Sequence, residues 1–429
     1  DGDFSVAIGY STLLVAESDS LNQEVYNTAV GSNAGRGVST GIHNTLIGGY
    51  AGGGATMTAD DNTLIGYQSG YAMTSATACV AVGGQALQTN ISGHYSTAVG
   101  FKALYANNTA ANNTAVGHLA LTTAADASAQ NTAVGSQALE DSNGAEYNTC
   151  VGYYAGKQIS DGNYNVTVGA NAGGGATLSG DHNVAVGYNA LNDNTSAAGN
   201  TAVGSGSLAV TATGAGNSAF GYAAGTSVTG TGNTLCGYSA GDVIQGGGYN
   251  VCIGYNTDPS ANDSSYQIVI GDTISGGEDS QFTFGKASNI VQNEFDTDAA
   301  WTRTSDERLK TNINASSLGL DFVNDLRPVT YQWKASQDLD SSDPQLEKLY
   351  NPDENLMNTD VVMHGLVAQE VKEALDTAGV DTFKGWSENS DGVQNISREM
   401  FVIPLIKAVQ ELSATVETLQ AEIELLKGE

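Results

Sequence analysis

Proline, cysteine and basic residues are scarce in this chain of 429 residues. It has five Pro, none of them before Pro259, and only 15 Lys and Arg against 46 Asp and Glu, so its net charge is −31. A surface this acidic repels a phosphate backbone, and we expect no nucleic-acid partner. No apolar run approaches about 18 residues, so we expect no membrane insertion. The long Pro-free region is typical of strands whose N–H groups are all needed for pairing.

The four cysteines fall inside repeat strands rather than in a spaced framework; they are Cys79, Cys150, Cys236 and Cys252. We interpret them as small buried hydrophobic residues of a protein that assembles in a reducing cytoplasm, with Cys236 and Cys252 on opposite faces of neighbouring coils. No loop has EF-hand spacing and the five His are scattered, so we predict no metal and no cofactor.

A five-residue unit of the form Asn-Thr-Ala-Val-Gly recurs along residues 5–271. Its Gly stands at positions 9, 31, 48, 66, 83, 100, 117, 135, 152, 169, 187, 204, 221, 237, 254 and 271. After a first gap of 22, every spacing is 16, 17 or 18 residues, which is typical of one coil of a solenoid. At about 4.8 Å per stacked strand, fifteen steps predict a rod of about 70 Å.

Alternation within the unit predicts a short strand. Unit positions 2 and 4, mostly Thr or Val and then Val or Ile, share one face, and position 3 is small or apolar on the other. We expect the coil interior to cover one face and a neighbouring chain the other. The Gly permits a tight corner, and a second short strand of the form Tyr-x-Ala-Leu or Tyr-x-Ala-Gly is predicted after it, for example over Gly66 to Gly70. The recurrent Asn at position 1 predicts a side-chain ladder along the stack, or else local turn bonds.

Residues 272–304 lose the period and become acidic and aromatic, with Phe282, Phe284, Phe295 and Trp301. We interpret them as a neck that caps or intertwines the chains. The remainder, residues 305–429, has a mixed α+β pattern, with a helix and strand within 318–334, a polar loop over 335–360, and a strand and amphipathic helix within 361–376. His364 is interpreted as structural. The first residue, Asp1, lies just before a repeat already under way, so we expect these residues to be part of a longer chain.

The last helix carries apolar residues in alternating steps of four and three, which predicts a coiled coil over 405–427; they are Leu405, Val409, Leu412, Val416, Leu419, Ile423 and Leu426. Alternation of Val or Ile with Leu favours two strands in isolated parallel coils. We nevertheless expect a homotrimer, because little more than three heptads cannot outweigh the symmetry of a long fibrous shaft.

The chain changes character at Ser305 to Ile313. A hydroxyl nucleophile with Lys310 five residues on is a possible serine-lysine dyad, in which a neutral amine takes the hydroxyl proton. The spacing alone is weak evidence, because Ser and Lys are common. Asp306 and Glu307 could hold the Lys310 ammonium or orient water, or they could be two solvated acids at a turn.

Four segments together resemble the endosialidase-type C-terminal intramolecular chaperone of phage tail fibres and tailspikes: Trp301 to Ile313, Leu326-Arg-Pro-Val-Thr-Tyr-Gln-Trp-Lys334, His364-Gly-Leu-Val-Ala-Gln-Glu-Val371 and Ile403 to Leu412. The resemblance implies one self-cleavage. Ser305 would attack the carbonyl of Thr304, Lys310 would act as general base, and the cut would fall between Thr304 and Ser305.

The repeats, for example Asn131-Thr-Ala-Val-Gly135, resemble the head repeats of trimeric autotransporter adhesins, which form a parallel β-roll. The period here is longer, which leaves the handedness and the number of strands per coil open. We therefore expect a mainly β protein: a trimeric parallel β-solenoid over 1–271, a neck over 272–304, and a small α+β chaperone over 305–429.

The expected function is that of a phage tail fibre or another virion appendage. Its partners would be upstream fibre or baseplate proteins and a host surface receptor, for which a glycan is one candidate, and it would assemble in the host cytoplasm. The alternatives are a bacterial trimeric surface adhesin and a glycan-binding tailspike shaft. Glycan cleavage is disfavoured, because the acids stand singly in turns and all three Trp lie beyond residue 300.

Overall fold

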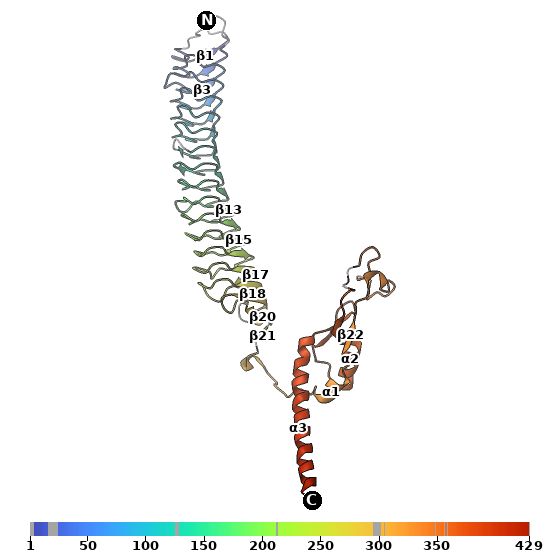
Figure 1. Cartoon of the computed structure of the whole chain (residues 1–429). Helices are drawn as coiled ribbons and strands as arrows, with labels where there is room; N and C mark the ends of the chain where they lie inside the picture. Colours follow the sequence, from blue (N-terminus) through green and yellow to red (C-terminus); the bar gives the residue numbers. More distant parts are fainter. Residues whose placement is uncertain are drawn as a thin grey trace. The chain divides into compact units, whose positions relative to one another are not determined.

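The computed structural model describes residues 4–15, 25–124, 128–211, 213–294, 302–303, 305–347, 349–355, 357 and 359–428. The chain divides into two compact units, Asp1–Ser305 and Asp306–Glu429. The first is a stack of coils, and the second is a small mixed domain that ends in a long helix (Figure 1). The division falls next to the predicted boundary between residues 304 and 305.

The first unit is built on one 19-stranded sheet within the described residues, and the predicted parallel β-solenoid is confirmed. From β1 to β19 each strand of this sheet pairs in parallel with the next one along the chain. The strands are β1 (Val6–Ile8), β2 (Thr28–Val30), β3 (Thr45–Ile47), β4 (Thr63–Ile65), β5 (Val80–Val82), β6 (Thr97–Val99), β7 (Thr114–Val116), β9 (Thr132–Val134), β11 (Thr149–Val151), β12 (Val166–Val168), β13 (Val184–Val186), β14 (Thr201–Val203), β15 (Ser218–Phe220), β16 (Thr234–Cys236), β17 (Val251–Asp258), β18 (Ile268–Ser275), β19 (Gln281–Lys286), β20 (Asn289–Glu294) and β21 (Thr302–Arg303). A separate parallel pair joins β8 (Thr123–Ala124) to β10 (Asp141–Ser142).

The solenoid interior is filled from two places in each coil. The middle residue of the strand is buried, while its two neighbours are half-buried or exposed, so unit position 3 faces inward, which the sequence had left open. The Ala and Leu that follow the Gly corner are also fully buried, for example Ala86 and Leu87. Burying a Leu side chain contributes about 2 kcal/mol, so the interior stabilises each coil without help from another chain.

A ladder of asparagine side chains runs through the buried corner before each strand, which confirms the ladder prediction. Asn131 Oδ1 accepts from the backbone N–H of Asn148 (2.9 Å), and Asn148 Oδ1 accepts from that of Asn165 (2.9 Å). The Asn148 amide donates to the carbonyl of Gly162 (2.9 Å). Each of these rungs thus satisfies the backbone N–H of the next, which matters because an unpaired buried N–H costs about 1–3 kcal/mol.

The Gly corner is required, but the second strand predicted after it is absent from the described coils that hold β1 to β16. In β17 and β18 the strand itself continues past the Gly, at Gly254 and Gly271. The φ of Gly135 is +137°, and a Cβ there would lie 2.4 Å from the carbonyl oxygen of Gly152 in the next coil. In the coils of β1 to β16, the segment that follows the Gly is a turn whose alternate residues have positive φ, as at Gln85 (61°) and Leu87 (51°). Their N–H groups still bond to adjacent coils, so the segment stacks as a strand would while its backbone follows a different path. Most coils therefore hold one three-residue strand.

The sheet continues past residue 271. Strand β18 runs to Ser275, and β19 stacks on it in parallel with Gly285 opposite Gly271. Spacing alone did not reveal this coil, because the interval to Gly285 is 14 residues. Strand β20 then turns back antiparallel to β19, and β21 pairs with β20, which ends the parallel stack. The predicted neck residues Phe295 and Trp301 lie outside the described residues.

The cysteine prediction is right for three residues and wrong for one. Cys79, Cys150 and Cys252 are buried, and all four cysteines are free. Cys236 is exposed, because it is the last residue of β16 and points away from the interior. It lies opposite Ile253, while Cys252 lies opposite the buried Leu235, so Cys236 and Cys252 do point to opposite faces.

The second unit has the α+β outline that the sequence predicts. Its elements are the 3-10 turn η1 (Glu307–Leu309), α1 (Leu320–Asp325), β22 (Val329–Tyr331), η2 (Ser336–Asp338), β23 (Met363–Gly365), α2 (Ala368–Thr377), β24 (Trp386–Glu388), β25 (Gln394–Ile396), η3 (Arg398–Phe401) and α3 (Val402–Lys427). The pairs β22–β23 and β24–β25 are antiparallel. A small core of Leu318, Phe322, Val371, Ala374, Leu375 and Phe401 joins α1, α2 and the start of α3.

Candidate functional site

The segment that opens the second unit is held by Asp306. Its side chain caps η1 by accepting from the backbone N–H of Arg308 (2.9 Å), and it pairs with the Arg308 guanidinium (Nε to Oδ1 3.0 Å, Nη2 to Oδ2 2.6 Å). The Arg308 side chain, the Arg308 N–H and the charge of Lys310 together lower the pKa of Asp306. Asp306 therefore organises the local backbone, and Arg308 is a partner that the sequence alone did not indicate.

The other predicted site residues lie on the surface. Lys310 ends η1, and its backbone N–H donates to the carbonyl of Glu307 (2.9 Å). Glu307 and Lys310 have exposed side chains, as does Ser305, the last residue of the first unit. Thr304 lies outside the described residues. The structure thus brings Asp306, Arg308 and Lys310 together, and the Ser305–Lys310 dyad stays a prediction.

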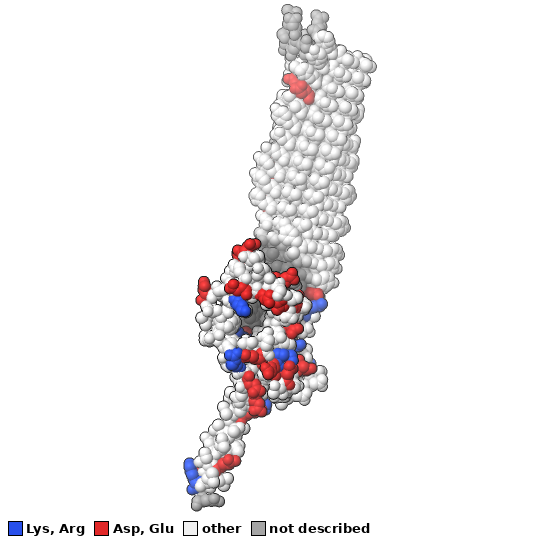
Figure 2. Space-filling model, turned by 90° about the vertical axis from the view of Figure 1, so that its right-hand side faces the viewer, with Lys and Arg blue, Asp and Glu red and all other residues white. Residues whose placement is uncertain are grey.

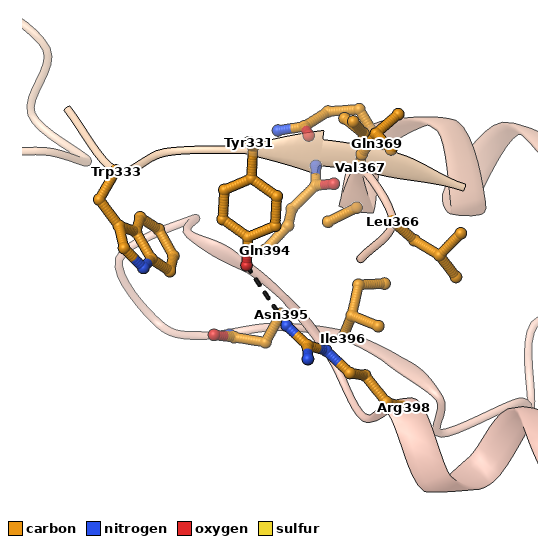
Figure 3. Close-up of a pocket in the computed structure, with 11 residues that line it drawn as sticks. Tyr331, Trp333, Leu366, Val367, Gln369, Gln394, Asn395, Ile396 and Arg398 are labelled. Atoms are coloured by element: carbon orange, nitrogen blue, oxygen red, sulfur yellow. Dashed lines mark hydrogen bonds between the residues drawn. The ribbon is translucent and has the colours of Figure 1, made fainter. Parts of the chain in front are cut away.

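An open pocket of about 470 Å³ lies beside β22 and β25 (Figure 3). Two of the segments that carry the family resemblance contribute to it, the first through Tyr331 and Trp333 and the second through Leu366 to Gln369. The rings of Tyr331 and Trp333 meet edge to face with centroids 5.4 Å apart. The side chains of Gln394 and Arg398 complete the wall, with Arg398 donating to the Tyr331 hydroxyl (3.4 Å). Sequence reasoning named the two segments but not this wall.

A second pocket, of about 360 Å³, is mainly apolar and reaches the long helix. Its lining residues are Val323, Leu326, Pro328, His364, Gly365, Leu366, Arg398, Phe401 and Leu405. His364 is the middle residue of β23 and is exposed, so it forms part of this wall rather than of the segment around Ser305. Leu405 belongs both to the pocket and to the predicted coiled-coil seam. The pocket is therefore continuous with an apolar surface on α3.

The seam of α3 has no cover in the single chain. All seven of its residues, from Leu405 to Leu426, are exposed by 43% to 74%. Glu411 anchors the helix from another side, since Oε2 accepts from the backbone N–H of Leu320 (2.7 Å) at the start of α1. An exposed apolar stripe of this length is unfavourable in water and is typical of a helix surface that packs against a partner.

The outer side of the solenoid sheet is a second uncovered surface. We call it the strand face: the side chains at the first and third positions of those strands from β2 to β16 that belong to the 19-stranded sheet, and at the equivalent positions of β17 to β19. They are mainly Thr, Val and Ile, with no Lys, Arg, Asp or Glu among them. Figure 2 views the solenoid from the side that carries the strands and shows almost no charged side chains there apart from an acidic patch near the N-terminal end.

Exposed aromatic rings follow two edges of the coils. One column consists of residues that precede the Asn corner, where Tyr147 stacks on Tyr164 (4.8 Å) and Tyr164 on His182 (5.0 Å). A second column follows the Gly corner, where Tyr222, Tyr238 and Tyr255 stack at 5.0 and 5.1 Å. The first column has positive φ, near 58° at Tyr164 and His182, a conformation in which Gly or Asn is less strained than an aromatic residue. The backbone conformation at this corner therefore does not explain why aromatic residues occur there.

Within the described ranges, no three His, Cys, Asp or Glu side chains are grouped as a metal site. In that same part of the chain, no helix has both the length and the apolar character needed to cross a membrane.

Comparison with known proteins adds one match. The model of the peptidase family described as chaperone of endosialidase matches residues 305–380. No curated protein matches the chain. The match begins at Ser305 and includes, from that residue on, the first three of the segments that carry the family resemblance. The second and third of these segments line the pocket of Figure 3. Residues 305–380 are thus similar to a family of self-cleaving intramolecular chaperones, and they directly follow a β-solenoid.

Proposed function

We propose that this chain is a fibrous virion appendage, a trimeric shaft for host attachment whose C-terminal chaperone aligns the chains and then cuts itself away between Thr304 and Ser305. One observation carries the proposal: a solenoid of near-identical coils is followed at once by a segment that matches the chaperone-of-endosialidase family. Upstream fibre or baseplate proteins would anchor the shaft.

The shaft gives the chaperone a physical task. Five strands, β2, β6, β7, β9 and β14, all read Thr-Ala-Val. A copy that is displaced by one coil would make nearly the same contacts over these strands, so the penalty for a slip is small. Pairing between distant parts of long chains is also slow, and it leaves apolar surface and unpaired strand edges exposed to aggregation in the meantime. A nucleus at one end that fixes the number and the alignment of the chains removes this route to misfolding.

Two surfaces support self-association in both units. The strand face is uncharged and half-exposed along the solenoid, and the α3 seam is apolar and exposed. Copies of the same chain would cover both at once, because each copy brings one strand face and one seam. We propose three copies, which places three strand faces around one axis and continues into a three-stranded coil.

The proposed cleavage is a single turnover. Lys310 takes the proton of Ser305 Oγ as the oxygen bonds to the carbonyl carbon of Thr304. The peptide bond breaks as the Ser305 nitrogen takes a proton and leaves as the new amino terminus, and water then hydrolyses the ester to free the Thr304 carboxylate. A lysine acts as a base only when its amine is neutral, which needs burial or a nearby positive charge. Lys310 is exposed in the single chain, so we propose that assembly of the trimer completes this site.

Mass spectrometry under denaturing conditions tests the cleavage. The native chain should give a fragment ending at Thr304 and a second beginning at Ser305. Ser305→Ala and Lys310→Ala should each give only the intact chain while still assembling, and Lys334→Ala should cleave normally as a control. An intact native chain would refute self-cleavage, and a cleaved Lys310→Ala chain would remove Lys310 from the mechanism.

The aromatic columns favour a neutral glycan as the receptor. Tyr147 and Tyr164 are exposed by 43% and 51% although they stack on each other, so each ring keeps surface for a ligand. The acidic solenoid disfavours anionic glycans. Tyr164→Asn should abolish binding on an array of neutral and anionic glycans without lowering the melting temperature, because Asn suits a positive φ. Ser179→Asn is the control. An array on which no neutral glycan binds the native shaft would refute this receptor class.

A further inference from the structure

The strand face is not uniform along the solenoid. Over β15 to β19 the strands or their aligned segments read Ser-Ala-Phe, Thr-Leu-Cys, Val-Cys-Ile, Ile-Val-Ile and Phe-Thr-Phe. Large side chains project outward there, with Phe220, Ile253, Ile270 and Phe284 exposed by 45%, 38%, 37% and 39%. The five Thr-Ala-Val strands upstream present only Thr and Val. The face therefore becomes larger and more varied toward the C-terminal end of the solenoid.

The backbone also widens in this stretch. Strands β17 (Val251–Asp258) and β18 (Ile268–Ser275) have eight residues each, whereas β2 to β7 have three. The rings of Phe282 and Phe284 contact each other at 5.5 Å. More area is thus available for contact with another copy at these coils than at any Thr-Ala-Val coil, and its shape differs from one coil to the next.

From this contrast we propose that β15 to β19 form a register segment, which fixes the axial alignment of the copies and keeps it after residues 305–429 have left. The inference rests on the proposed self-association through the strand face. Along the sheet strands from β5 to β14 a slip by one coil leaves Thr and Val opposite Thr and Val, but in the register segment it sets Phe220 opposite Cys236 and Ile270 opposite Phe284. Such mismatches leave voids or overlaps, which close-packed interfaces do not tolerate.

The position in the chain fits this role. The register segment is the last part of the parallel stack before the matched chaperone segment begins at Ser305. A chaperone that aligns the chains at this end would engage the varied coils first, and the uniform coils would then add one after another in the alignment already set. After the bond between Thr304 and Ser305 is cut, the varied coils are the part of the shaft in which a displacement of one copy by one coil is energetically unfavourable.

Disulfide trapping between two marked chains tests the proposal. Every chain carries Cys236→Val, because the other three cysteines are buried. One marked chain carries Val116→Cys and the other Val134→Cys, which are paired positions on neighbouring coils. After co-expression and self-cleavage, the shafts are held just below their melting temperature and then oxidised. Copies in register form 116–116 and 134–134 disulfides, whereas a slip by one coil forms 116–134 disulfides.

The decisive comparison uses two matched pairs of substitutions at the same position of the coil. Ile253→Val with Ile270→Val lies in the register segment, and Ile47→Val with Ile65→Val lies in the uniform part. Val occupies this position in most coils, so both double variants should fold. Circular dichroism checks this. We expect 116–134 disulfides to rise about tenfold in the register-segment pair, and further when Phe220→Val and Phe284→Val are added, but not in the control pair.

Equal and low yields of the 116–134 disulfide in all variants would overturn the proposal. A high yield of this disulfide in shafts whose register segment is native would overturn it too. Absence of either type of disulfide in every variant would show that the strand faces do not meet. That result would overturn the proposed association through the strand faces and this inference with it. Association through the α3 seam and self-cleavage are measured separately, by sedimentation and by mass spectrometry, so the two failures are distinguishable.

Discussion

The two units of this chain differ in how far each can stabilise itself. In the solenoid, the coils bury small and aliphatic side chains, mainly Ala and Leu, and bond to the coils above and below, so the interior is complete within one chain. The second unit has a six-residue core and a 26-residue helix with an exposed apolar seam. The repetitive unit is thus stable but ambiguous in alignment, and the small unit is specific but incomplete alone.

The largest expected effect comes from breaking the incomplete unit. Leu412→Asp with Leu419→Asp places charges in the α3 seam, where burying them is prohibitive. We expect loss of the trimer in sedimentation and, because assembly completes the site, loss of self-cleavage. Gln410→Glu with Gln420→Glu adds the same charge outside the seam and should change neither. Normal cleavage by the monomeric double variant would contradict the proposed dependence on assembly.

The solenoid should be most sensitive at its Gly corners. Gly135→Ala adds a Cβ 2.4 Å from the Gly152 oxygen at a φ of +137°, and we expect it to cost about 4 kcal/mol or more in thermal or urea unfolding of the shaft. Gly144→Ala also has positive φ, but no atom lies within 4 Å of its Cβ, so about 1–2 kcal/mol is expected. Equal losses would mean that the stack tolerates the contact.

The next largest loss of stability is expected from breaking the asparagine ladder. Asn148→Ala leaves the buried N–H of Asn165 and the carbonyl of Gly162 without their partners, which should cost about 2–3 kcal/mol. Asn148→Ser should cost less, because Ser96 occupies a natural rung of the ladder and its Oγ accepts from the N–H of Asn113 (3.4 Å). If denaturant unfolding of the two variants is equally affected, the ladder acts through packing rather than through hydrogen bonds.

The sequence predicted the repeat better than it predicted the path within a coil. The period directly reports which residues stack, and the alternation of Thr, Ala and Val reports which residues share a face, although it does not say which face points inward. The turn after each Gly was predicted as a strand because its pattern of buried Ala and Leu resembles one. The difference lies in φ angles, positive at Gln85 and Leu87, and neither residue type signals that conformation.

The C-terminal unit shows the opposite balance. Its helices and first two strands followed from apolar periodicity, and the segments of the family resemblance located the candidate site. The hairpin of β24 and β25 and the pocket wall of Gln394 and Arg398 did not, because they depend on contacts between segments far apart in the sequence. Arg308 was missed for a different reason: a short-range cap on Asp306 has no apolar signature.

The smallest predicted effect concerns pH, where the two units should respond with opposite signs. Burial in the solenoid and the charge of nearby Asp242 raise the pKa of Asp258 to about 6, above its usual 3.8. The folded shaft therefore keeps a proton there that the unfolded chain releases, and stability falls as the pH rises from about 4 through 6. Asp258→Asn should flatten this slope by at most about 1 kcal/mol, because the carboxyl is partly exposed and screened.

In the second unit, the N–H of Leu320 and the side chain of Lys407 lower the pKa of Glu411 below 4.5. Here the ionised carboxylate is favoured by folding, so the anchor between α3 and α1 is complete above pH 4.5 and is lost as the pH falls through the lowered pKa. Unfolding of a self-cleaved sample followed separately for the two fragments should show the shaft gaining stability between pH 7 and pH 4, while the chaperone fragment loses it below that range. Glu411→Gln should reduce the acid sensitivity of the chaperone fragment and leave the pH response of the shaft unchanged. If the stability of the two fragments changes with pH in the same direction, other carboxylates dominate the pH dependence. The contrast between the two units would then not include their response to pH.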